Sequence, residues 1–63
     1  MAHFIEIFIE LNVKQPMLKK GIEPTAKAML EYATEQLKTA MGIDDVVNWT
    51  AAVQILKNNL KNQ

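Results

Sequence analysis

The sequence predicts an α+β fold, with one N-terminal strand at about residues 3–13 and an antiparallel helix pair at about 24–41 and 44–61. Apolar residues alternate along the first segment and recur every three to four residues in the other two. Gly and Pro residues separate the three segments. The 63-residue chain has the length of a single small domain, residues 1–63. An all-α three-helix bundle is the alternative, because periodicity alone does not distinguish strand from helix in short apolar runs.

The first segment favours a strand because β-branched and aromatic residues alternate along it. With a period of two, one face carries the aliphatic residues Ile5, Ile7, Ile9, Leu11 and Val13. The opposite face carries Phe4, Glu6, Phe8, Glu10 and Asn12. In a helix, Glu10 would instead pair favourably with Lys14. That helix would bury Asn12 and Gln15 in its apolar arc, so we prefer the strand.

Residues 15–24 are predicted to be a connection that packs on the core. Pro16 and Pro24 disfavour the helical conformation at the residue before each of them. Gly21 can take a positive φ and end a single helical turn. The connection is too apolar for a solvated linker, since it contains Met17, Leu18 and Ile22.

The two helices are predicted from their end signals and their apolar stripes. Pro24 suits a first helical position, Gly42 a C-terminal stop and Asp44 an N-cap. The stripe of the first helix is Ala26, Met29, Leu30, Ala33, Leu37, Ala40 and Met41. The stripe of the second is Val46, Trp49, Val53, Leu56 and Leu60. A turn of only two residues brings these stripes face to face.

The second helix carries an additional apolar line at Val47, Ala51 and Ile55, spaced four residues apart. A helix on a protein surface needs only one apolar stripe. Two stripes indicate contact on two sides of this helix. Either the predicted strand or connection of the same chain or a neighbouring subunit covers the second one.

Self-association follows from the predicted strand, because a lone strand has no partner for its N–H and C=O groups. Chains of about 60 residues usually need a disulfide, a metal or a partner subunit. There is no Cys and only one His, which leaves a homodimer or higher oligomer, or pairing with another protein. In an antiparallel ribbon, an axis at or next to Ile7 or Ile9 keeps Glu6 from facing Glu10. The expected interaction surface is Phe4, Glu6, Phe8, Glu10, Val47, Ala51 and Ile55.

The residue types present argue against an enzyme and against a cofactor or metal site. The chain has neither Cys nor Ser to act as a nucleophile. His3 lies near the terminus, and nothing in the sequence places a nucleophile or carboxylate beside it, as a catalytic His requires. The start lacks a basic signal-peptide region and no apolar run approaches a membrane span, so we expect a cytoplasmic protein. The leading interpretation is a non-enzymatic protein–protein interaction or regulatory module.

A strand followed by two helices resembles the element order of ribbon-helix-helix DNA-binding proteins. That resemblance implies a dimer whose paired strands enter the major groove, and a transcriptional regulator as the alternative function. The face that would enter the groove carries Phe4, Glu6, Phe8 and Glu10. The net charge is zero and there is no Arg, whereas phosphate contacts require basic residues. Protein partners are therefore favoured over nucleic acid.

Overall fold

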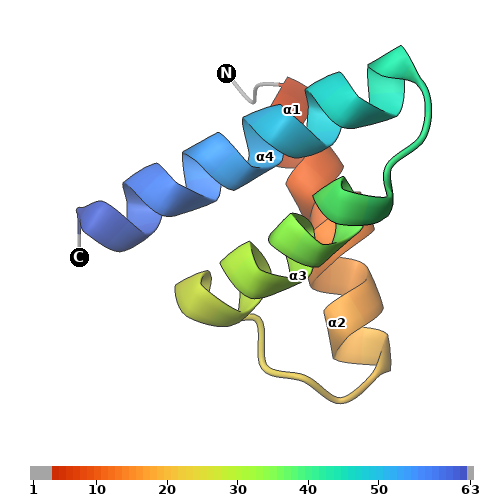
Figure 1. The fold of residues 1–63 in the computed structure, drawn as a ribbon. Helices are drawn as coiled ribbons and strands as arrows, with labels where there is room; N and C mark the ends of the chain where they lie inside the picture. The colour runs from red at the N-terminus through yellow and green to blue at the C-terminus, as the bar shows by residue number, and fades with distance from the viewer. Residues whose placement is uncertain (1–3, 63) are drawn as a thin grey trace.

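The structure is a computed structural model that describes residues 4–62, and every regular element within that range is helical (Figure 1). Helix α1 spans Phe4–Ile9, a π-helical segment η1 spans Glu10–Lys14, and α2 spans Gln15–Lys19. These three follow one another without a break and form one first helix. Helices α3, Ala26–Thr39, and α4, Ile43–Lys61, complete the fold. The arrangement is an all-α three-helix fold, which fits the alternative and not the α+β prediction.

The predicted strand at about residues 3–13 is wrong, because the chain is helical from Phe4 onward. A helix satisfies its backbone N–H and C=O groups within its own segment, so no ladder partner is needed. The ribbon with its axis at Ile7 or Ile9, completed by a second subunit, is therefore wrong as well. The element order shared with ribbon-helix-helix proteins also disappears from the described residues.

The π-helical turn is explained by the proline that follows it. The Gln15 N–H donates to the Glu10 carbonyl, five residues earlier instead of four. Pro16 has no N–H, and in a regular α-helix its ring would clash with the carbonyl of Asn12. The wider turn changes the angular spacing, and both Asn12 and Gln15 are exposed. The side-chain amide of Asn12 donates a hydrogen bond to the Phe8 carbonyl at 3.1 Å. The helix therefore forms without burying the side-chain amide of Asn12 or that of Gln15.

Helix α3 begins two residues later than Pro24, the predicted start. Thr25 is its N-cap, and its Oγ1 accepts a hydrogen bond from the Ala28 N–H at 3.2 Å. The helix ends at Thr39, before the predicted residue 41. The first helix ends just before Gly21. The φ of 75° at Gly21 confirms the predicted end of a helical turn there.

The turn between α3 and α4 depends on Gly42, with φ 91° and ψ 150°. Helix α4 starts directly after this glycine, so Asp44 lies in the first turn and is not the N-cap. An acidic residue in the first turn still faces the positive end of the helix dipole. The two helices run back across each other as a hairpin, with α1 behind α4 in Figure 1.

The core receives side chains from all three helices. Its buried members are Val13, Met17, Ala33, Val53 and Leu56. Around them pack Ile9, Ala28, Met29, Leu30, Tyr32, Leu37 and Trp49. The middle of each predicted stripe is confirmed, but Met41, Val46 and Leu60 at the stripe ends are exposed. From the predicted connection, Met17 is buried while Leu18 and Ile22 are exposed.

Candidate interaction surface

The first helix has a second apolar face that remains largely exposed among residues 4–62. Phe4, Ile7 and Leu11 are 65%, 47% and 61% exposed, and we call these three residues the α1 stripe. Their spacing of three and four residues places them on one side of the helix. The opposite side carries Ile9, Val13 and Met17, which pack in the core. The first helix is therefore apolar on two sides, and the described part of the chain buries one of them.

A second exposed apolar cluster lies at the turn between α3 and α4. Met41 and Ile43, on either side of Gly42, are 83% and 82% exposed. The first turn of α4 adds Val46 and Val47, which are 41% and 57% exposed. We call Met41, Ile43, Val46 and Val47 the hairpin tip. Figure 1 shows this turn at one end of the molecule, far along α4 from the C-terminus.

The two clusters adjoin one aromatic contact between α1 and α4. The rings of Phe8 and Trp49 meet edge to face, with centroids 4.8 Å apart and planes at 77°. Phe4 precedes Phe8 by one helical turn, and Val46 precedes Trp49 by one helical turn. Each cluster therefore begins one turn away from the same pair of rings.

The size of the two clusters can be compared with the cost of association. Burying a whole apolar side chain of this kind is worth about 2 kcal/mol. Scaled by the exposed fractions, the α1 stripe offers about 3.5 kcal/mol per copy and the hairpin tip about 5 kcal/mol. Association costs about 4–15 kcal/mol in lost translational and rotational freedom. Burial of the stripe from two copies would lie within that range, whereas burial of both clusters would exceed it.

The four N-terminal residues proposed for the interaction surface do not share one face. Phe4 and Glu6 are exposed, whereas Phe8 is half-buried against Trp49. The carboxylate of Glu10 lies 3.7 Å from the Lys14 ammonium and accepts a hydrogen bond from the Gln15 amide at 2.9 Å. On a helix, Phe4 and Phe8 lie on one side, while Glu6 and Glu10 lie on another.

The three residues proposed on the second helix do stay on one side of α4, at intervals of four residues. Val47 is exposed, and Ala51 and Ile55 are half-buried. Sequence reasoning missed five exposed members of the two clusters, which are Ile7, Leu11, Met41, Ile43 and Val46. Helical spacing of Phe4, Ile7 and Leu11 is the signal that would have found the stripe.

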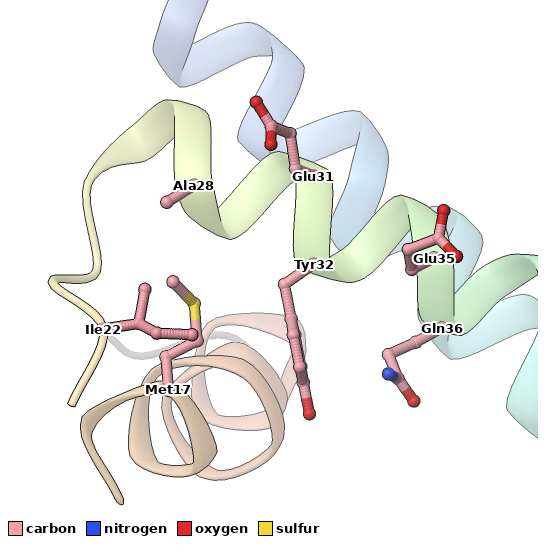
Figure 2. A pocket seen from close by; sticks show the side chains of 7 residues that line it. All are labelled: Met17, Ile22, Ala28, Glu31, Tyr32, Glu35 and Gln36. Carbon is pink, nitrogen blue, oxygen red and sulfur yellow. The ribbon is translucent and has the colours of Figure 1, made fainter. Parts of the chain in front are cut away.

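An open pocket of about 480 Å³ lies between the end of the first helix and α3 (Figure 2). Its lining residues are Met17, Ile22, Ala28, Glu31, Tyr32, Glu35 and Gln36. Met17 of α2 and Ile22 of the following loop lie side by side, and Tyr32 projects from α3 toward the helix that carries Met17. Glu31 and Glu35 point to the other side of α3, so the floor is apolar and the charges lie at the outer edge. Glu35 is also paired with Lys38 at 3.2 Å.

No group of three or more potential metal-ligating side chains occurs among residues 4–62. His3 lies outside the described residues. Within the same described range, no helix has the length and hydrophobicity to cross a membrane. No protein-family model, no curated protein and no solved structure matches this chain.

Proposed function

We propose that the protein is a non-enzymatic protein–protein interaction module that acts as a homodimer, with the α1 stripe of each copy covered by the other copy. The observation that carries this proposal is the exposure of Phe4, Ile7 and Leu11 on a helix whose other side is already buried. A solvated helix in a small domain needs only one apolar side. A helix of a second copy that packs on the α1 stripe would explain why this other side is apolar as well.

The stripe is suited to a copy of itself. Ile7 lies between Phe4 and Leu11. Two antiparallel copies can therefore place Ile7 against Ile7 and Phe4 of each copy against Leu11 of the other. This is the self-complementary arrangement of a twofold interface. The formal net charge of zero means that two copies meet without overall repulsion. This proposal rests on the exposed stripe and does not depend on an unpaired strand.

Sedimentation equilibrium tests the proposal over concentrations from about 1 μM to 1 mM, which spans weak to moderate affinities. The wild-type chain is expected to shift from monomer to dimer within that range. Leu11→Glu places a charge on the stripe and is expected to weaken dimerisation by at least about tenfold. Asn59→Glu is the matched control, because it adds the same charge at an exposed site near the C-terminal end of α4.

Circular dichroism at 222 nm shows whether each variant keeps the helical fold. A wild-type chain that remains monomeric at every concentration contradicts the proposed homodimer. Equal weakening by Leu11→Glu and Asn59→Glu would show that charge, and not the stripe, controls association.

A further inference from the structure

We infer that the hairpin tip is the second half of the homodimer interface, so that one partner copy covers both the tip and the α1 stripe. This inference rests on the proposed function and assigns a second surface to it. The residues it adds are Met41, Ile43, Val46 and Val47.

The first support is the area that a stable dimer needs. A standard interface buries about 800 Å² per partner, and about 65% of a homodimer interface is apolar, which requires roughly 500 Å² of apolar surface. Complete burial removes roughly 100 Å² for an aliphatic side chain and roughly 200 Å² for Phe. Scaled by the exposed fractions, the stripe supplies roughly 240 Å² and the tip roughly 260 Å². Together the two clusters reach the required area, whereas either one alone supplies about half of it.

The second support is the position of the two clusters on the fold. Both begin one helical turn from the contact between Phe8 and Trp49. A partner that extends from the stripe across this contact reaches the start of α4, where Val46 and Val47 are exposed. The packing of α1 against α4 therefore puts the stripe and the start of α4 on either side of the same pair of rings.

The third support is that the tip is not needed to build the monomer. Met41 and Ile43 lie outside the buried core and the apolar residues that pack against it. Exposed apolar side chains that gather in one patch are typical of an interaction site, whereas single ones are common on any surface. A second copy provides the apolar partner that residues 4–62 of the same chain do not.

The test compares Ile43→Glu with Leu11→Glu and with the control Asn59→Glu in sedimentation equilibrium. Ile43 is the first residue of α4, where a carboxylate interacts favourably with the helix dipole. The Ile43→Glu monomer is therefore expected to fold at least as well as the wild type. We expect its dimer dissociation constant to rise at least about tenfold, which corresponds to about 1.4 kcal/mol. Backbone amide NMR signals of residues 41–47 are expected to shift with protein concentration, together with those of residues 4–11.

The outcomes separate the inference from the proposed function. If Leu11→Glu weakens the dimer and Ile43→Glu does not, the tip lies outside the interface and the inference is overturned, while the proposed homodimer stands. If amide signals at residues 41–47 stay constant while those at 4–11 shift, the inference is overturned in the same way. A monomeric wild type overturns the proposed function and the inference with it. Weakening by both variants, but not by Asn59→Glu, supports the joint surface.

Discussion

The comparison of Leu11→Ala with Val13→Ala tests the helical first segment most directly. On a strand these two residues would share one face, since side chains alternate with a period of two. On the helix, Val13 is fully buried in the core, whereas Leu11 is 61% exposed. If the segment were a strand, the two truncations would lower the free energy of unfolding by similar amounts. In the observed helix, they are expected to lower it by very different amounts.

The magnitudes follow from burial. Val13→Ala removes two buried methyl groups and leaves a cavity, at a cost of about 1.5–3 kcal/mol. A domain of 63 residues has a total stability of roughly 3–9 kcal/mol, so this loss is a large fraction of it. The midpoint of thermal unfolding is expected to fall by about 4–8 °C for each kcal/mol lost. Leu11→Ala replaces an exposed residue by the best helix former and is expected to change stability by less than about 0.5 kcal/mol.

Urea unfolding followed by Trp49 fluorescence is a suitable assay, because the indole contacts Phe8 at 4.8 Å and Tyr32 at 6.5 Å between ring centroids. The measurement belongs at micromolar or lower protein concentration, where dimer formation adds little to the apparent stability. At higher concentration, the cost of Leu11→Ala is expected to grow, because the stripe then contributes through association. Equal destabilisation by the two variants at low concentration would refute the helical assignment.

Three further predictions concern the ends of the helices and nucleic acid. Gly42→Ala is expected to lower the free energy of unfolding by about 1–3 kcal/mol in thermal unfolding, because φ 91° with ψ 150° is a conformation that only Gly adopts readily. The cost comes from the backbone, since a Cβ would meet no atom within 4 Å. No loss of stability would mean that the turn takes another conformation. Thr25→Ala is expected to cost about 1 kcal/mol in urea unfolding by removing the cap of α3, while Thr25→Ser restores most of the loss. No mobility shift of duplex DNA is expected at physiological salt, since a neutral chain without Arg lacks phosphate-neutralising charge; a shift that weakens steeply with added salt would contradict this.

The helix pair could be predicted because its signals are local. Gly42 marks the turn, and the apolar stripes recur at a helical period over more than ten residues each. The middle residues of those stripes, such as Ala33 and Leu56, are buried as expected. Their ends were not predictable. Met41 lies in the turn, beyond the end of its own helix at Thr39, and Leu60 lies in the last turn of α4, the longer of the two helices, and both are exposed.

The first segment could not be decided from its pattern. Ile5 through Val13 alternate as a strand would, and the same residues also place Ile9 and Val13 four apart on one helical side. Asn12 and Gln15 count against a helix because a regular spacing of 100° per residue would place both in its apolar arc. A π-helical turn ahead of Pro16 removes that objection, and such a turn leaves no signal in the hydrophobic pattern.

The sequence by itself determined the number of segments, the hairpin of α3 and α4, and the apolar residues from which a core can be made. The tertiary structure alone decided that the first segment is a helix and which of its two apolar sides is buried. The physical reason is that backbone hydrogen bonds of a helix close locally, whereas burial depends on where the neighbouring helices lie. Because α3 and α4 pack against Val13 and Met17, Phe4, Ile7 and Leu11 are left on the outside, available to a partner.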